Sequence, residues 1–501
     1  MILGIDIGTH NAHAAWVDEA GIVRPVIFRD GPHFSALARQ TMHGLLLGEA
    51  AADAQVGNAE TTLVGCTRLM CRPADLSAAQ RARLPFAVRE AGGDLLCDLL
   101  YAEAQPAQVY GQIVRALVAA SLPTLGDVQI ALAVPASADD RFRVLARAAC
   151  TAQGISVARI CSAPAAALRA AAIPGQPRTV LILHLGDAVA EATLAQRSAA
   201  GWQIVATTHN DAIGGDDMAW HAAAQLNTRF AASGCDVFAA DDGRLAAQGL
   251  RAAAEDALRT LAAAAQTTLT LDHGGGFGRD LVAHVTRAEA DAWLTPALRQ
   301  LTDLMRSACQ RVVPDAVLLI GSWAWLPQLP ATICTALHVS PRQVTLASAD
   351  LVARGAALLA RDPHPLVWDV TPYALGIDCH YDGIALLSTI IAPNTPIPTT
   401  GKPGAHTESF QTLFPNQTSV TLRVLQYRGN RNPLPAATAQ ILPDECETLG
   451  TWQFSGLKPK RGGHAAFTIT FAVDADGVLA LSARETATGR TLQARVERTI
   501  G

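Results

Sequence analysis

Lysine is almost absent from this chain of 501 residues. Lys402, Lys458 and Lys460 are the only lysines among 39 lysines and arginines, so residues 1–401 contain none. The basic residues form no block, and the net charge is −5. A chain without a basic patch lacks the electrostatic footprint of a protein that binds nucleic acid or a charged membrane surface. We expect neither as a partner.

Long apolar runs and closely paired cysteines are missing as well. No stretch approaches the ~18 apolar residues of a membrane-spanning helix, and the first residues, from Met1 to Asp6, lack the basic region of a signal peptide. The ten cysteines include no Cys-x-x-Cys pair, which argues against a zinc site or a disulfide framework. We therefore expect a cytoplasmic protein with reduced, mostly buried thiols.

The first part of the chain has an α/β pattern. Half of all residues are hydrophobic, which suits a globular protein of two to four domains at ~100–200 residues each. Short apolar runs alternate with alanine-rich stretches of helical period. A strand that ends in glycine and polar residues occurs twice, at residues 4–9 and 183–187, which suggests an internal duplication. Strands are expected at Ile2–Ile7, Val128–Val134, Val180–Leu185 and Val317–Ile320, and helices at Asp139–Gln153, Asp216–Phe230, Leu245–Ala265 and Ala288–Arg311, the last with a capping box from Thr286 to Glu289.

The pattern changes after Ala360. No long helical run follows, and the residues from Thr371 onward read as alternating strands and turns. The run Phe467–Val473 has a period of two, and it reaches a turn at Asp474–Gly477. We expect one domain over residues 1–362, an apolar and therefore docked linker over 363–370, and a β-rich domain over 371–501.

Two glycine turns are candidate phosphate sites. Gly8-Thr9-His10-Asn11 follows an apolar strand and could be an ordinary hairpin turn or a turn whose N–H groups cradle a phosphate. Asp6, two residues earlier, could hold a hydrated magnesium ion. Gly214-Gly215 precedes a helix, whose first N–H groups also attract anions. Two such turns in one domain favour a nucleotide as ligand.

Read in order, these and further segments resemble the DnaK-type family of seventy-kilodalton heat-shock chaperones over essentially the whole chain. The resemblance implies an α/β, actin-like (ribonuclease H-like, duplicated) nucleotide-binding domain, followed by an all-β sandwich that binds extended peptides. The segments that carry it are Gly4–Asn11, Val134–Ala136, Ile213–Asp217, Glu255–Leu261, Ile320–Gly321, Asp350 with Gly355–Ala357, Asp369–Pro372, Leu375–Ile377, Asn394–Pro398 and Asp474–Val478.

The resemblance also implies ATP or ADP with magnesium as ligands of the first domain. Asp6 would hold the metal. Trp325 stands where the family has an arginine that stacks on the base, and its indole could stack on adenine or fill the adenine site. The residues implied for nucleotide binding are Gly8, Thr9, His10, Asn11, Gly186, Asp187, Gly214, Gly215, Glu255, Arg259, Gly321, Ser322, Trp325 and Asp350.

The catalytic positions of the family are changed. Thr67 replaces the expected lysine, Ala163 the expected glutamate and His184 the expected aspartate. Since one preorganised donor is worth ~100–1,000-fold in rate, we expect ATP to be bound but hydrolysed slowly or not at all. A carboxylate from Asp187 or Glu191 and a cation from Arg68 could partly compensate.

The second domain and the linker retain more of the family pattern. An extended peptide would form main-chain hydrogen bonds while its side chains enter pockets. A J-domain cochaperone and a nucleotide exchange factor are possible partners. The chain stops where the family's helical lid would begin, so fast peptide exchange is expected. The implied peptide-binding residues are Ile377, Phe410, Val420, Leu422 and Val473 in a central pocket, with His380 and Leu413 as an arch, and the implied interdomain residues are Pro135, Arg143, Arg159 and Asp369.

Three functions are compatible with these observations. The first is a chaperone that binds apolar stretches of unfolded chains under weak nucleotide control. The second is a pseudo-ATPase scaffold whose first domain serves only for interactions. The third is a sugar or acid kinase, which would share the actin-like fold; the linker and the peptide domain make it remote.

Overall fold

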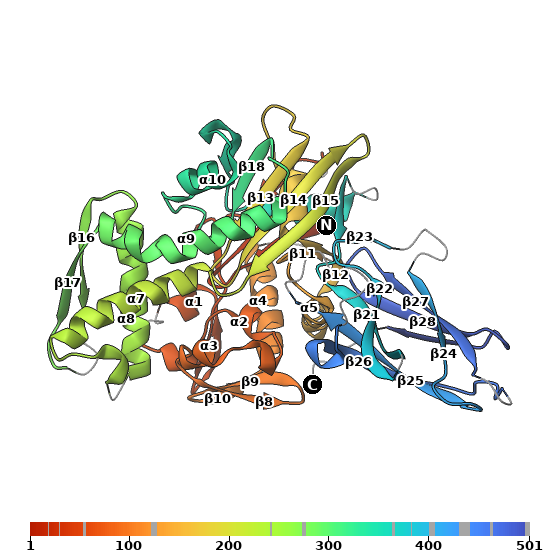
Figure 1. The fold of residues 1–501 in the computed structure, drawn as a ribbon. Helices are drawn as coiled ribbons and strands as arrows, with labels where there is room; N and C mark the ends of the chain where they lie inside the picture. The colour runs from red at the N-terminus through yellow and green to blue at the C-terminus, as the bar shows by residue number, and fades with distance from the viewer. Residues whose placement is uncertain are drawn as a thin grey trace.

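The computed structural model describes residues 1–18, 20–29, 31–53, 57–121, 128–240, 243–272, 277–362, 366–381, 383–399, 406–429, 441–460 and 464–495. Mixed α/β structure up to α11 is followed by a C-terminal part made of strands (Figure 1). The change of pattern after Ala360 is thus confirmed for the described residues.

The first large sheet has the order β12–β11–β1–β2–β3, with β4 paired to β2. β1 is antiparallel to β2 and parallel to β11. The strands are β1 (Ile2–Ile7), β2 (Asn11–Val17), β3 (Val23–Pro25), β4 (Phe34–Ser35), β11 (Gln129–Val134) and β12 (Ser156–Ser162).

The second large sheet repeats this order as β19–β18–β13–β14–β15 and continues through β20 and β23. β13 is antiparallel to β14 and parallel to β18, as β1 is to β2 and β11. The two halves therefore share one topology, as the repeated glycine turn suggested. The strands are β13 (Thr179–Leu185), β14 (Ala190–Ser198), β15 (Gly201–Asn210), β18 (Ala316–Ile320), β19 (Val344–Leu346), β20 (Val367–Val370) and β23 (Pro396–Ile397).

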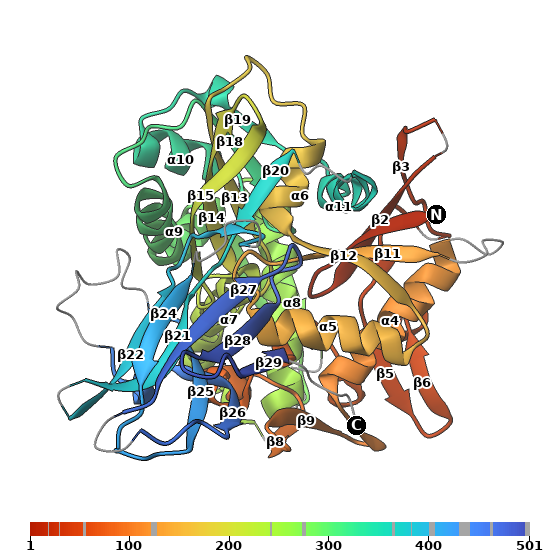
Figure 2. The same ribbon diagram turned by 90° about the vertical axis from the view of Figure 1, so that its right-hand side faces the viewer.

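Helices cover both faces of each large sheet. Alternate residues of β13 enter different cores, since Leu181 and Leu183 pack with α7 and α9 while Val180 and Ile182 pack with α6 and α11. The helices α6 and α11 thus lie between the two sheets (Figure 2), and α4 and α5 cover the outer face of the first. The helices are α1 (Glu49–Ala52), α2 (Cys66–Leu69), α3 (Ala78–Ala82), α4 (Pro106–Ser121), α5 (Asp140–Ala152), α6 (Ala163–Ala170), α7 (Gly215–Ala232), α8 (Gly243–Leu261), α9 (Arg287–Cys309), α10 (Leu329–Leu337) and α11 (Leu351–Arg361).

The helix ends follow local signals. Thr286 caps α9 and forms the predicted capping box with Glu289. The prediction of helix up to Ala265 was wrong, because α8 ends at Leu261 and β16 begins at Gln266. Alanine carries no strong stop signal, so the end of an alanine-rich helix is hard to read from sequence. All ten cysteines are free, and six of them are buried.

Three small sheets extend from this N-terminal part. Two flank α1–α3 and a third projects beyond α7 and α8 (Figure 1). Their strands are β5 (Ala38–Thr41), β6 (Gly44–Leu47) and β7 (Thr62–Leu63); β8 (Ala87–Ala91), β9 (Asp94–Leu99) and β10 (Ala102–Ala104); and β16 (Gln266–Leu271) and β17 (Leu281–Thr286).

The C-terminal part consists of two four-stranded antiparallel sheets, β22–β21–β25–β26 and β24–β27–β28–β29. The inward side chains of both sheets share one apolar core. The predicted strand, turn and return strand are present as β27, the turn at Asp474–Gly477 and β28. The strands are β21 (Ala374–Tyr381), β22 (Ile384–Ile391), β24 (Thr407–Gln411), β25 (Ser419–Tyr427), β26 (Glu447–Ser455), β27 (Ala466–Val473), β28 (Leu479–Glu485) and β29 (Thr491–Arg495).

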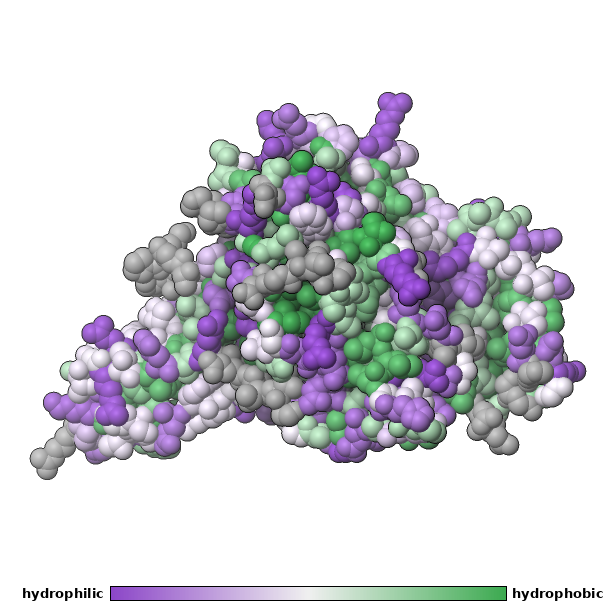
Figure 3. All heavy atoms as spheres, turned by 180° about the vertical axis from the view of Figure 1, so that it is seen from behind, coloured by the Kyte–Doolittle hydropathy of each residue, from purple (hydrophilic) through white to green (hydrophobic). Residues whose placement is uncertain are grey.

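Seen from behind, hydrophobic and hydrophilic residues alternate over the molecule, with hydrophobic patches near its middle (Figure 3). None of the helices in the described ranges combines the length and the apolar character needed to cross a membrane.

Candidate functional site

The predicted glycine turns meet where the two large sheets come together. In the turn after β1 the Gly8 N–H donates to Asn11 O at 2.9 Å. In the turn after β13 the Gly186 N–H donates to Val189 O at 3.0 Å. Gly215 at the start of α7 donates its N–H to Gly186 O at 2.9 Å. Three of the predicted nucleotide-binding segments are therefore adjacent, although they lie far apart in the sequence.

Asp187 links these turns to the loop after β18. Its Oδ2 accepts from Ser322 Oγ at 2.9 Å and its Oδ1 from Trp323 Nε1 at 2.8 Å, while His10 Nδ1 lies 3.6 Å from Oδ2. Burial opposes the negative charge, but His10 and the two donors hold the pKa of Asp187 well below its ordinary value. The same contact raises the pKa of His10 against the effect of burial. Asp187 thus joins both halves of the cleft as a buried anion.

A second pair consists of His184 and Glu191. His184 is the residue that replaces the aspartate implied by the family resemblance. His184 Nδ1 lies 2.9 Å from Glu191 Oε2, and Glu191 also accepts hydrogen bonds from Ala136 N, Ser137 N and Ser137 Oγ. Burial would raise the pKa of Glu191, but His184 and these donors lower it to about 2. The carboxylate in turn raises the pKa of His184, although burial acts the other way. An imidazole thus stands where the family resemblance implies an acid.

Two tryptophans, Trp323 and Trp325, pack together on the side of the cleft where the resemblance implies adenine binding. The guanidinium carbon of Arg259 lies 4.9 Å from the centre of the Trp325 ring, and Trp323 and Trp325 are 5.4 Å apart. Trp323 is fully buried, and a Cβ on Gly215 would lie 2.0 Å from its ring. Glu255 accepts from Arg259 at 2.8 Å and lies 2.9 Å from Arg251 NH2. The predicted residues Glu255, Arg259 and Trp325 therefore contact one another directly.

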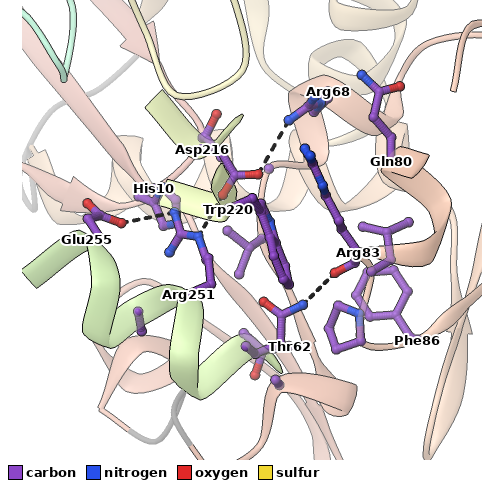
Figure 4. Close-up of a pocket in the computed structure, with 18 of the residues that line it drawn as sticks. His10, Thr62, Arg68, Gln80, Arg83, Phe86, Asp216, Trp220, Arg251 and Glu255 are labelled. Atoms are coloured by element: carbon purple, nitrogen blue, oxygen red, sulfur yellow. Dashed lines mark hydrogen bonds and ion pairs between the residues drawn. The ribbon is translucent and has the colours of Figure 1, made fainter. Parts of the chain in front are cut away.

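A cavity of about 300 Å³ opens beside this cluster (Figure 4). Thr9, His10 and Glu255 line one part of it, and Trp220 and Phe86 another. Arginines and carboxylates connect its two walls: Arg68 lies 3.5 Å from Asp216 and 3.7 Å from Asp217, Arg83 lies 2.6 Å from Asp217, and Arg251 lies 2.7 Å from Asp216.

Sequence analysis missed four of these residues. Arg251 lies four residues before Glu255 on α8, a spacing that can indicate a helical ion pair. No local signal marks Arg83, Phe86 or Trp220, because they meet only when α3 and the residues after it approach α7. Asp350 immediately precedes α11, and its carboxylate accepts from Arg354 Nε of that helix at 2.5 Å.

Two of the predicted interdomain residues, Arg143 and Arg159, contact the C-terminal sheets. Arg143, which is buried, donates to Asp476 O at 3.0 Å, and Arg159 lies 3.6 Å from the Asp476 carboxylate. Asp369 accepts from Ser162 N at 3.3 Å. Pro135 O accepts from the Ala138 N–H at 3.0 Å, which shapes the turn before α5. The predicted linker residues Val367–Val370 form β20, which pairs with β15 on one side and β23 on the other.

The predicted peptide-binding residues divide by burial. Ile377, Leu422 and Val473 are buried in the shared core of the two sheets, while Phe410 and Val420 are only partly buried against it. The ring of Phe410 stacks on Phe467 at 6.0 Å.

The residues predicted to form the arch are both exposed. Leu413 is 52% exposed and is followed by Phe414 at 68%, which the sequence analysis did not select. His380 is exposed near the end of β21.

Asp6, the predicted magnesium ligand, lies near the end of β1. Burial raises the pKa of Asp6, although His13 and His184 oppose this shift. Across the described ranges no cluster of three or more His, Cys, Asp or Glu side chains is arranged to hold a metal ion.

Comparison with known proteins gives a consistent result. The sequence pattern of the family described as Hsp70 protein matches residues 2–501. Proteins named chaperone protein HscA homolog are similar over 98% of this chain: those of Bordetella petrii (28% identity, 77% of its length), Laribacter hongkongensis (29%, 77%) and Acidithiobacillus ferrooxidans (28%, 76%).

Proposed function

Since this chain belongs to the Hsp70 family, we propose that it is a chaperone whose C-terminal sheets bind extended apolar segments of unfolded polypeptides. The observation that carries this proposal is the incomplete burial of Phe410 and Val420 at the margin of the shared core, beside the exposed Leu413 and Phe414. Partly open apolar groups next to strand edges suit a peptide that forms main-chain hydrogen bonds and inserts alternate side chains.

The variant Val420→Phe tests this proposal. A ring at this position would fill the space left for a client side chain, so affinity for a fluorescent apolar peptide should fall at least ~10-fold, or 1.4 kcal/mol. Val282→Phe is the matched control, because Val282 is 52% exposed on β17, outside the C-terminal sheets. Unchanged peptide affinity in a folded Val420→Phe protein would sink the proposal.

For the N-terminal cleft we propose weak binding of ATP or ADP with little hydrolysis. The meeting of the glycine turns supports binding, and the replacements at Thr67, Ala163 and His184 support slow turnover. Calorimetric titration with magnesium ATP, followed by a single-turnover hydrolysis assay on the same sample, tests both parts. Binding without turnover is the expected result, and rapid hydrolysis would contradict it.

The second candidate function is a scaffold whose cleft binds no nucleotide. The contact of Arg259 with Trp325 favours it, because these residues occupy the adenine side themselves. Complete absence of nucleotide binding in the same titration would select it.

A cytoplasmic J-domain cochaperone is the partner that we propose at the interdomain contact. Arg159 and Asp369 retain the family residues there, and both take part in polar contacts. Stimulation of peptide capture by such a cochaperone, lost in Asp369→Ala, would support this role; a response of equal size in the variant would argue against it.

A further inference from the structure

Two carboxylates beside the glycine turns, Glu191 and Asp187, are already occupied by protein donors. A carboxylate offers about four acceptor positions, and buried Glu191 has a donor at each. Ser137 N and Oγ approach Oε1 at 2.8 and 2.7 Å, and Ala136 N and His184 Nδ1 approach Oε2 at 3.1 and 2.9 Å. Glu191 has no acceptor position left.

Asp187 is nearly as fully engaged. Both of its oxygens accept a hydrogen bond, from Ser322 and Trp323, and His10 approaches the first of these oxygens at 3.6 Å. The residue is only 6% exposed. Releasing it would leave the Trp323 N–H buried without a partner, which costs roughly 1–3 kcal/mol.

A hydrated magnesium ion needs free acceptor groups around its waters. The ion keeps several waters in its octahedral shell, and each water needs acceptors for its hydrogens. Asp6 is the remaining carboxylate on these strands, and it lies within electrostatic reach of two imidazoles, His13 and His184. One carboxylate among imidazoles, beside two carboxylates that protein donors already hold, does not fit a hydrated magnesium ion.

We infer that this cleft does not hold magnesium, and that it takes the polyphosphate of a nucleotide without a divalent cation. This inference rests on the nucleotide binding proposed above. Three arginines line the cavity with Thr9 and His10, and two of them, Arg83 and Arg251, are held in ion pairs of 2.6 and 2.7 Å. Arg68 is therefore the arginine that we assign to the phosphates. Its two ion pairs, at 3.5 and 3.7 Å, are longer than charge-assisted hydrogen bonds, so the guanidinium can turn toward a stronger anion.

The first test compares ATP affinity in magnesium with ATP affinity in EDTA by calorimetry. We expect the two dissociation constants to agree within ~3-fold. In EDTA, Arg68→Gln should weaken binding ~10-fold, whereas Arg89→Gln, an exposed arginine on β8, should not. Binding that is more than ~10-fold tighter with magnesium would overturn the inference.

The second test needs no nucleotide. Manganese ions alone are titrated into the protein and followed by electron paramagnetic resonance. We expect no submillimolar site in the wild-type protein, and a new site in His184→Asp, which adds a carboxylate and frees one of the two occupied acceptor positions of Glu191 Oε2. A wild-type manganese site that disappears in Asp6→Asn would refute the inference. If ATP fails to bind under all conditions, the proposed nucleotide binding fails, while the manganese titration still decides the question of the metal.

Discussion

At the scale of single residues, the predicted adenine side of the cleft is already filled by protein side chains. Arg259 lies over the Trp325 ring, and Glu255 holds Arg259 in place. A cation over an indole contributes about 0.5–2 kcal/mol, which a base must replace before it can enter. The replacement of the family's arginine by Trp325 is visible in the sequence. Whether the indole stacks on a base or on Arg259 depends on the position of α8, which the sequence does not show.

Removing the indole should open this site. In Trp325→Ala, Arg259 loses its stacking partner, so we expect ATP affinity to rise at least ~3-fold in a calorimetric titration. Trp293→Ala is the control, because Trp293 lies under Arg229 in the same way at 5.2 Å but on α9, outside the group formed by Glu255, Arg259 and Trp325. A fall in affinity in Trp325→Ala would mean instead that the indole stacks on the base.

At the scale of elements, the packing of α11 holds the two large sheets together. A Cβ on Gly355 would lie 1.7 Å from Ala166 O of α6, and one on Gly4 would lie 2.1 Å from Ala353 O of α11. Glycine therefore allows backbone to approach backbone at both faces of this helix. The glycines can be read from the sequence, but the reason for them lies in elements about 190 and 350 residues away along the chain.

We expect Gly355→Ala to destabilise the protein strongly. The methyl group has no space unless α6 and α11 separate, and overpacking of a core costs roughly 1–3 kcal/mol or more. The urea midpoint of the first unfolding transition is the measurement. Gly57→Ala is the matched control, since a Cβ at Gly57 meets no atom within 4 Å and the backbone there suits any residue. Equal midpoints in the two variants would contradict the packing argument.

At the scale of the whole molecule, charged residues hold the C-terminal sheets against the N-terminal part. Arg428 on the C-terminal side contacts Asp75 at 3.0 Å and Asp139, and it also contacts Glu447 of its own side at 3.0 Å. Arg147 contacts the Asp476 carboxylate, and the Leu479 N–H donates to Asp140 at 2.6 Å. The docked arrangement thus depends on a few buried or half-buried charges.

Loss of Arg428 should loosen this arrangement. Arg428→Ala leaves the buried Asp139 without its cation and leaves Glu447 with Arg72 alone, a change that costs about 2 kcal/mol or more at an interface. We expect a larger radius of gyration in small-angle X-ray scattering. Arg89→Ala, which removes an exposed arginine paired only within its own small sheet, should leave the radius unchanged. An unaltered radius in Arg428→Ala would show that the other contacts suffice.

The same interface should make stability depend on pH. Burial raises the pKa of Asp140 from its ordinary value of 3.8 to about 7, so the folded protein holds this proton more tightly than the unfolded chain. Stability contributed by the protonated group is therefore lost as the pH rises from about 4 to about 7, by at most ~1.4 kcal/mol per pH unit. Asp140→Asn keeps an oxygen for Leu479 and carries no charge, so its stability advantage over the wild type should grow between pH 5 and pH 8. A constant difference in urea midpoint would disprove the shift.

The sequence by itself determined the features that local chemistry encodes. The capping box of α9, the period of two in β27, the change of pattern after Ala360 and the replacements at Thr67, Ala163 and His184 all depend on residues close together in the chain. The contacts that fill the cleft and join the two parts of the molecule depend instead on residues that lie far apart in the chain. Trp323 meets Asp187 across 136 residues and Arg428 meets Asp139 across 289. A carboxylate is free or saturated according to the donors that the fold brings to it, and no spacing within one segment can show those donors.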